Sequence, residues 1–570
     1  MKAKKFLALL LVAIMTLSMA ACSVPGENTD SSKDSENTGS TGDTNSGGTA
    51  TPDNGGSTPE TIGEKVFRYS IVTPPTTLDP QKANSIGDNE LAHAMQEGLV
   101  RNVGGEVRAA GAESWEISED GLTYTFHLRD NTWSDGQPVT AADYVYGLQR
   151  LMDPATASGY AFIGEYLVNG REVETGEAAP TELGISAPDD KTVVMQLNDP
   201  TAYFLALIGS CAQYSPARQD IVEQYGETYA ADAGKNVYSG PFKLVSSANQ
   251  QWIFEKNENF WDAANIHFDR VEVSEISNPD TALALYEAGE LDFYKLGTSQ
   301  VSLYAGQDES YMNGNEDYLY INHASENTVL GNQNFRLALN YGLDRVTYNQ
   351  LANAGTYDPW NRIVMPLVNG ASKTYGEEYS PEAYPMEGDN AKALEYLQAA
   401  MSEMGIASAS DITVELTTTD VESSKKIAEV IQEQWKTNLG INVDVRQVTY
   451  SEIYGTVFPS HDYQVGYGGW GPDYPDPYTY LELFISDNPY NYSNYNNAEF
   501  DAIMAATRTE TDVKARMDML FQAEQMLLDD GANVPLQLRT EHYLLDDDIS
   551  GVVLYFSAIN LDWAYGDVKQ

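Results

Sequence analysis

The chain has 570 residues and a formal net charge of −51, from 33 Lys and Arg against 84 Asp and Glu. Such a charge argues against nucleic acid and against anionic lipid as partners, because their phosphates would be repelled. The roughly 500 residues that follow the N-terminal segment exceed what one hydrophobic core usually serves, so we expect two or three domains.

The first residues predict a secretory leader. Lys2, Lys4 and Lys5 precede an apolar run over 6–19 that is shorter than the roughly 20 residues of a membrane-spanning helix. Met19-Ala-Ala-Cys22 resembles a bacterial lipobox, which predicts a signal peptide over 1–21 and lipidation of Cys22. Cleavage after Ala20, as in an ordinary secreted protein, is the alternative.

A polar segment follows the leader. Residues 22–61 are rich in Ser, Thr, Gly, Asn and Asp, with almost nothing apolar, which predicts a disordered linker. A lipidated cysteine and a linker would tether the protein to the outer face of the bacterial cytoplasmic membrane. Cys211 then has no cysteine partner, and we expect it to be a small buried residue.

The folded sequence begins with alternating strands. Apolar and polar residues alternate over 65–72 and again over 121–129, as in half-buried strands. A turn at Asp135-Gly136 follows. Thr140 then suits the N-cap of a helix over 141–150.

The second half predicts a parallel sheet. Strands over 411–416 and 441–445 flank a helix from Ser423 to Gly440, which makes a βαβ unit. Apolar stripes predict further helices over 389–404 and 512–530, with their stripes in the core. The pattern indicates a multi-lobed α/β protein.

A segment over 466–478 concentrates glycines, aromatics and two carboxylates. Gly466, Gly468 and Gly471 match the spacing of a dinucleotide-binding fingerprint, which needs a helix directly afterwards. Prolines at 472, 475 and 477 exclude that helix. We therefore expect a rigid loop with aromatic walls and an acidic side chain.

Two motifs carry a resemblance to a known family. Gly469-Trp-Gly-Pro-Asp473-Tyr-Pro-Asp-Pro477 resembles the Gly-Trp-x-x-Asp-Tyr-x-x-Pro loop of the oligopeptide-binding proteins of ABC importers. Phe126-His-Leu-Arg129, followed by Trp133-Ser-Asp-Gly-Gln-Pro-Val-Thr140, resembles the signature of peptide-type extracellular solute-binding proteins. Further matches run in order from 66 to 531.

The resemblance implies a periplasmic-binding-protein-like fold of class II. Two α/β lobes would close about a hinge, and an extra domain would be inserted in the first lobe. Lobe I would comprise 65–96, 220–313 and 540–567. The extra domain II would span 97–219, and lobe III would span 314–539.

The resemblance also implies a peptide site. Asp473 would pair with the α-ammonium of the peptide, although a plain turn aspartate is the alternative. Trp470 and Tyr160 would flank the first peptide residues, and Asn84 to Ile86 would meet the peptide. Close approach of the backbone would depend on Gly468 and Gly469.

Two positions depart from the family pattern. The family's best-known members have an arginine, available to a ligand carboxylate, where this chain has Tyr467. They have a disulfide-bonded cysteine where this chain has Gly471. Peptide length and recognition of the C-terminus are therefore open.

The leading prediction is a monomeric, lipid-anchored protein that binds oligopeptides for an ABC permease, without cofactor or catalytic residues. A binder of dipeptides or oligosaccharides on the same fold is the alternative. An extracellular hydrolase using Asp473 and Asp476 is a remote one, since no hydrolase motif occurs. The six histidines lack ligand spacing, which disfavours a metal site such as nickel.

Overall fold

The structure is a computed structural model that describes residues 63–557 and 559–569. The predicted signal peptide, the lipidated Cys22 and the linker over 22–61 lie outside the described residues. Within the part that is described, no helix combines the length and the apolar character needed to cross a bilayer.

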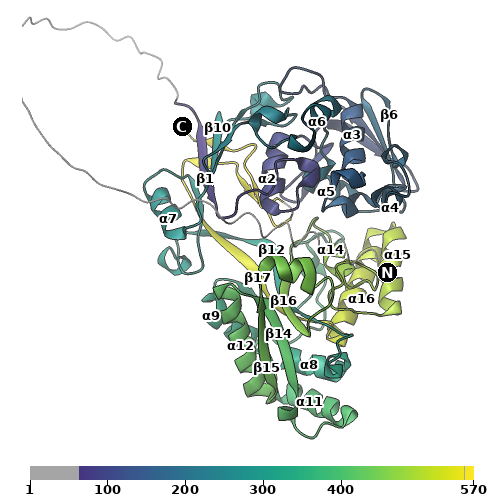
Figure 1. The fold of residues 1–570 in the computed structure, drawn as a ribbon, viewed down its shortest axis with the longest axis vertical. Helices are drawn as coiled ribbons and strands as arrows, with labels where there is room; N and C mark the ends of the chain where they lie inside the picture. Colours follow the sequence, from purple (N-terminus) through teal and green to yellow (C-terminus); the bar gives the residue numbers. More distant parts are fainter. Residues whose placement is uncertain (1–62, 558, 570) are drawn as a thin grey trace, which may run out of the picture. The chain divides into compact units, whose positions relative to one another are not determined.

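An eleven-stranded mixed sheet runs through the described chain (Figure 1). Two long antiparallel strands, β12 and β17, lie side by side at its centre. We call the strands next to β17 the β1 side and those next to β12 the β14 side. The bounds are β12 Glu309–Ile321 and β17 Asn533–Leu545; on the β1 side β11 Phe293–Lys295, β1 Val66–Ile71, β10 Arg270–Glu275, β9 Gln251–Lys256 and β8 Phe242–Ala248; and on the β14 side β16 Val465–Trp470, β14 Thr413–Thr419 and β15 Asn442–Val448, with β13 Asp358–Pro359 paired to β17.

The predicted βαβ unit is present on the β14 side. Strands β14 and β15 pair in parallel, with Thr413 opposite Asn442, and helix α12 (Glu422–Leu439) connects them. The helix ends at Gly440, whose φ of +74° is the left-handed conformation that glycine favours. Its start was predicted slightly wrongly, because Val421 and not Ser423 occupies the N-cap.

Side-chain caps define most of the other predicted helices. Asp389 accepts a hydrogen bond from the Lys392 amide at the start of α11, and Asp512 accepts one from the Ala515 amide at the start of α16. A continuous core between β14, α8, α11 and α12 contains Phe335, Val414 and Ile427. The helices that accompany the β14 side are α8 Gln333–Tyr341, α9 Arg345–Asn353, α10 Tyr375–Glu378, α11 Asn390–Met404, α13 Tyr450–Glu452, α14 Tyr478–Leu481, α15 Ala498–Thr509 and α16 Val513–Asp530.

A separate four-stranded antiparallel sheet, which we call the small sheet, lies in the first part of the chain. Helix α3 packs on it with Thr140 at its N-cap, as predicted, and the Asp143 side chain accepts hydrogen bonds from the Thr140 amide and hydroxyl. The elements of this region and of the β1 side are α2 Ile86–Met95, β2 Val100–Val103, β3 Glu106–Ala109, β4 Ala112–Ile117, β5 Thr123–Leu128, α3 Ala141–Met152, α4 Gly170–Glu174, β6 Ile185–Asp189, β7 Thr192–Gln196, α5 Phe204–Ser210, α6 Gln219–Tyr225 and α7 Pro279–Glu287. The C-terminal segment adds two short pairs, β18 Ile549–Ser550 with β21 Asp567–Val568 and β19 Val553–Leu554 with β20 Leu561–Asp562.

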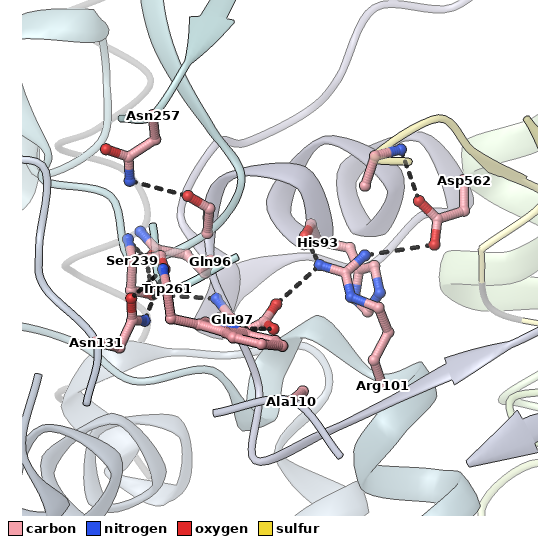
Figure 2. Close-up of polar contacts among 12 residues, drawn as sticks. His93, Gln96, Glu97, Arg101, Ala110, Asn131, Ser239, Asn257, Trp261 and Asp562 are labelled. Atoms are coloured by element: carbon pink, nitrogen blue, oxygen red, sulfur yellow. Dashed lines mark hydrogen bonds and ion pairs between the residues drawn. The ribbon is translucent and has the colours of Figure 1, made fainter. Parts of the chain in front are cut away.

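A buried polar network joins α2, the β2–β3 hairpin and the C-terminal segment (Figure 2). The Arg101 guanidinium donates to Glu97 at 2.9 Å, to Asp562 at 3.3 Å and to the carbonyl oxygen of His93 at 3.0 Å. The indole of Trp261 donates to the other Glu97 oxygen at 3.0 Å. Because both charges of the Arg101–Glu97 pair are buried, these contacts tie the segments firmly together.

The segment over 466–478 is only partly the loop that we predicted. Its first five residues belong to β16, an internal strand between β14 and β12. The glycines fit because their neighbours are too close for a side chain: a Cβ on Gly466 would lie 2.4 Å from the Phe458 ring, and one on Gly469 would lie 2.3 Å from the carbonyl oxygen of Glu316. The loop begins only after Trp470.

Candidate ligand-binding site

A cavity of about 550 Å³ opens where the β1 side, the small-sheet region and the β14 side meet. It includes six of the eight predicted ligand-binding residues, which come from three separate stretches of chain. They are Asn84, Ile86, Tyr160, Gly469, Trp470 and Asp473.

The other two predicted residues do not line the cavity. A Cβ on Gly468 would lie 2.6 Å from the Tyr320 ring, so the close approach at this glycine is to a core tyrosine and not to a ligand. The ring of Tyr467 is half-buried against the core of the β14 side. Gly469 does line the cavity, although its tightest contact is with the backbone of β12.

Strand β16 and the loop after it place Trp470 and Asp473. Trp470 is the last residue of β16 and lies opposite Glu316 of the antiparallel strand β12. The Thr479 hydroxyl lies 3.4 Å from both the Trp470 indole nitrogen and the Asp473 amide nitrogen, and it holds the two ends of the turn together. The loop geometry is therefore fixed by residues within ten positions of one another.

An aromatic row crosses the cavity wall. Tyr160 packs on Phe162 with ring centroids 4.9 Å apart, Phe162 packs on Tyr490 at 5.6 Å, and Tyr490 meets the edge of Trp470 at 5.5 Å. Tyr160 and Phe162 come from the small-sheet region, whereas Tyr490 and Trp470 come from the β14 side. The row thus connects two walls that are far apart in the sequence.

Asp473 is a buried carboxylate without a cation. Asp473 is only 8% exposed, and its carboxylate accepts a hydrogen bond from the Tyr160 hydroxyl at 3.0 Å. No Lys, Arg or His among the described residues pairs with it. Burial raises the pKa of Asp473 to about 6, and the hydrogen bond from Tyr160 offsets only part of that rise. The site therefore lacks a positive charge at this point.

Asp476, the second acid of the loop, is fully engaged in the structure. Arg516 donates to its two oxygens at 2.7 and 2.9 Å, and both residues are buried. An acid locked in a bidentate ion pair is not available for general acid or base chemistry. The pair Asp473 and Asp476 therefore does not support a hydrolase.

Sequence reasoning missed several charged residues of the cavity. Arg539 of β17 and Asp317 of β12 form an ion pair at 2.8 Å, and Glu316 lies beside them. Burial raises the pKa of Glu316 well above its ordinary value. No local motif marks these residues, because they meet only through the pairing of strands more than 200 positions apart.

The cysteine and two of the histidines are buried in the fold. Cys211 is buried as expected, and burial raises the pKa of its thiol. Burial lowers the pKa of His93 and of His323 to about 3. In the part of the chain that the structure describes, no group of three His, Cys, Asp or Glu residues could hold a metal ion.

Residues 106–492 match the family described as "Bacterial extracellular solute-binding proteins, family 5 Middle". The chain is 31% identical to the oligopeptide-binding protein OppA of Bacillus subtilis, over 97% of each chain. It is 28% identical to the dipeptide-binding protein DppE of the same organism, over 89% of this chain and 92% of DppE.

A solved structure of Listeria monocytogenes OppA bound to peptide has 30% identity and a TM-score of 0.74. That match covers 89% of this chain and 100% of the other. The predicted class II periplasmic-binding-protein-like fold is thereby confirmed.

Proposed function

Because the chain belongs to the family 5 bacterial extracellular solute-binding proteins, we propose that it captures oligopeptides in the cavity and delivers them to an ABC permease. Proteins of this family bind solutes and are not enzymes. The relatives named oligopeptide-binding and dipeptide-binding support a peptide ligand. The observation that carries the proposal is the buried, unpaired carboxylate of Asp473.

Asp473 would receive the α-ammonium of the peptide. A charge pair formed inside a cavity away from water couples by roughly 2–5 kcal/mol, far more than an exposed pair. Trp470 and Tyr160 would flank the first peptide residues. Tyr160 would also keep the Asp473 carboxylate in place through the 3.0 Å hydrogen bond.

Amide side chains would bind the peptide main chain. Asn84 and Asn315 line the cavity, and within the described ranges their side-chain NH₂ groups donate to no other residue. An amide offers both donors and acceptors, which match the carbonyl and N–H groups that every peptide presents. Such contacts give affinity without sequence preference.

Binding would close the protein about the two central strands. The predicted lobe boundaries at 313/314 and 539/540 fall within β12 and β17, and β12 has a bulge between Met312 and Glu316. Gly314 in this bulge has a φ of +83°, which favours glycine. We place lobe I at 65–96, 220–313 and 540–567, domain II at 97–219 and lobe III at 314–539.

Location completes the proposal. Acylation of Cys22 and the linker over 22–61 would keep the protein at the outer face of the membrane, within reach of its permease. Metabolic labelling with a palmitate analogue, with Cys22→Ser as the control, tests this part. Labelling of both proteins alike would contradict it.

A neutral oligosaccharide is the second candidate, because aromatic side chains such as Tyr160, Tyr454 and Trp470 line the cavity. It explains the aromatic walls but leaves the Asp473 charge unpaired. A dipeptide would satisfy Asp473 equally well. Peptide length therefore has to be measured.

Calorimetric titration of the purified protein with tri- to hexapeptides tests the function. The same peptides N-acetylated, and the variant Asp473→Asn, should bind at least tenfold more weakly, each tenfold being about 1.4 kcal/mol. Asp444→Asn, which alters an exposed acid on β15, is the matched control and should bind normally. Equal binding of free and acetylated peptides would contradict the role of Asp473, and no binding at all would contradict a peptide ligand.

A further inference from the structure

Arg539 is the one cationic side chain that lines the cavity in the described part of the chain. The other charged residues there are Asp317, Glu316 and Asp473. The side chain of Arg539 is 42% exposed, although it is held by a carboxylate. A cation exposed in an otherwise acidic cavity is a candidate partner for a negatively charged group of the ligand.

The guanidinium is fixed along one edge only. Its Nε lies 3.0 and 3.1 Å from the two Asp317 oxygens, and Nη2 lies 2.8 Å from one of them. Asp317 is 2% exposed and also accepts from the Gln537 amide at 2.7 Å, so it cannot follow a moving arginine. Among the described residues, Nη1 donates to none.

A guanidinium has two edges that can each hold a carboxylate with two parallel hydrogen bonds. Asp317 takes the edge formed by Nε and Nη2. The edge formed by Nη1 and Nη2 remains. Because the first edge is held by a buried group, the second is oriented before any ligand arrives, which lowers the entropy lost on binding.

Strand order explains why this cation comes from β17. Strand β12 lies between β16 and β17, so Tyr467 of β16 and Arg539 of β17 both approach Asp317 from its two sides. The buried carboxylate of Asp317 helps to raise the pKa of the Tyr467 hydroxyl and that of Arg539. Tyr467 thus supplies no positive charge beside Asp317, and Arg539 supplies that charge from β17, on the other side of β12.

We propose that the free Nη1–Nη2 edge of Arg539 binds the C-terminal carboxylate of the peptide. This inference rests on the proposed function, since it presumes a peptide whose ammonium lies at Asp473. The ligand class is then a peptide with both ends free. Asp473 discriminates against a blocked N-terminus, and Arg539 discriminates against a blocked C-terminus.

Two fixed charges also select peptide length. Asp473, in the loop after β16, and Arg539, on β17, are both held by the fold in one cavity, and each extended residue adds roughly 3.3–3.6 Å to a peptide. Only one chain length can place its ammonium at Asp473 and its carboxylate at Arg539 together. Shorter and longer peptides would satisfy one charge and lose the other.

Calorimetric titration with alanine peptides of two to six residues, each as free acid and as C-terminal amide, tests the inference. We expect the acid to bind at least tenfold more tightly than the amide at one length, with little difference at the other lengths. In Arg539→Gln the acid and amide should bind alike at every length. Arg171→Gln, which removes a 77% exposed arginine outside the cavity, should keep the difference.

The outcomes separate the two proposals. If the protein binds peptides but treats acids and amides alike at every length, the role of Arg539 is wrong and the peptide function stands. If Arg539→Gln keeps the difference, another residue holds the carboxylate and the inference is again wrong. If no alanine peptide binds in either form, the proposed function fails and this inference falls with it.

A folding defect can be told apart from a binding defect. Arg539→Gln leaves the buried Asp317 without its cation, so the double variant Arg539→Gln/Asp317→Asn removes both charges. Circular dichroism and thermal melting check that it folds. A folded double variant that still prefers the acid at one length would overturn the inference.

Discussion

Asp473 and Asp476 are three residues apart in one loop and yet have opposite roles in the fold. Asp476 is neutralised by Arg516, whereas Asp473 has only the Tyr160 hydroxyl. A buried carboxylate that lacks a cation costs the empty protein stability, because the charged form is poorly solvated. The unpaired carboxylate that the ligand needs therefore lowers the stability of the empty protein.

Asp473→Asn should therefore stabilise the empty protein at pH 7. A pKa raised from 3.8 to about 6 corresponds to a cost of about 3 kcal/mol while Asp473 is ionised. The folded state holds the proton more tightly than the unfolded state, so the cost exists above pH 6 and disappears as the pH falls toward 4. Urea unfolding at pH 7 and pH 4 measures it.

The expected result is a gain for Asp473→Asn at pH 7 that vanishes at pH 4. The exposed Asp444→Asn should show no gain at either pH. A destabilised Asp473→Asn at pH 7 would mean that the carboxylate has a favourable partner in the fold.

Peptide affinity should depend on pH through the same group. An ammonium binds the ionised form of Asp473, whose pKa in the empty site is about 6. Affinity should therefore be highest near pH 7, fall by up to about tenfold per pH unit below 6, and fall again above about pH 8 as the peptide ammonium loses its proton. Titrations of a free peptide from pH 5 to pH 8 measure this, and a flat profile in the wild type would contradict it.

Part of the site could be predicted at this scale. Trp470 and Asp473 lie in one contiguous motif, and Tyr160 and Asn84 lie in segments that resemble the family's, so the resemblance was sufficient to bring them into one cavity. Arg539 and Asp317 meet through the pairing of β12 with β17, which no local pattern encodes. Tyr467 was placed in the site by its distance from Trp470, yet its ring packs against the core.

At the scale of elements, β16 depends on the absence of side chains. Its glycines gave a loop-like pattern, and only the nearness of β12 and of Phe458 shows why a strand needs them. Helices α3, α11 and α16 were predictable, because their caps and apolar stripes are local. Of the sheet neighbours, the parallel pair β14 and β15 was predictable from its βαβ pattern, and the other pairs were not.

Gly469→Ala should therefore destabilise the fold. The added Cβ would lie 2.3 Å from the Glu316 carbonyl oxygen, a backbone atom of the central strand that cannot move aside cheaply. We expect a loss of about 1–3 kcal/mol, as for other overpacked sites. Thermal melting of the empty protein measures it.

Gly455→Ala is the matched control for this substitution. Gly455 lies in the helical turn Ile453–Val457, and a Cβ there would meet nothing within 4 Å. It should leave the melting temperature unchanged or raise it slightly. Equal melting temperatures for the two variants would show that β12 can shift.

At the scale of the whole molecule, the network around Arg101 holds the small-sheet region to the β1 side and to the C-terminal segment (Figure 2). We therefore expect the small-sheet region, the β1 side and the C-terminal segment to move as one body in the proposed closure. Strands β12 and β17 continue from the β1 side into the β14 side, and we expect the proposed closure to bend the chain there.

Arg101→Met should destabilise the protein by about 3–5 kcal/mol, because Glu97 and Asp562 would lose their buried cation. Arg108→Met is the matched control, since Arg108 lies directly opposite Arg101 in the β2–β3 hairpin and its ion pair with Glu106 is exposed. Its loss should cost less than about 1 kcal/mol. Urea unfolding compares the two, and equal losses would contradict a special role for the network.

The central strands also have a consequence for how the chain folds. Glu309 of β12 and Tyr543 of β17 meet although they are 234 residues apart, and β1 pairs with β10 about 200 residues later. Such non-local pairing means a high contact order and slow folding. The large sheet cannot be completed until almost the whole chain has been synthesised. A newly made chain therefore stays unfolded for a time, and that is the state in which a polypeptide can be threaded through an export channel.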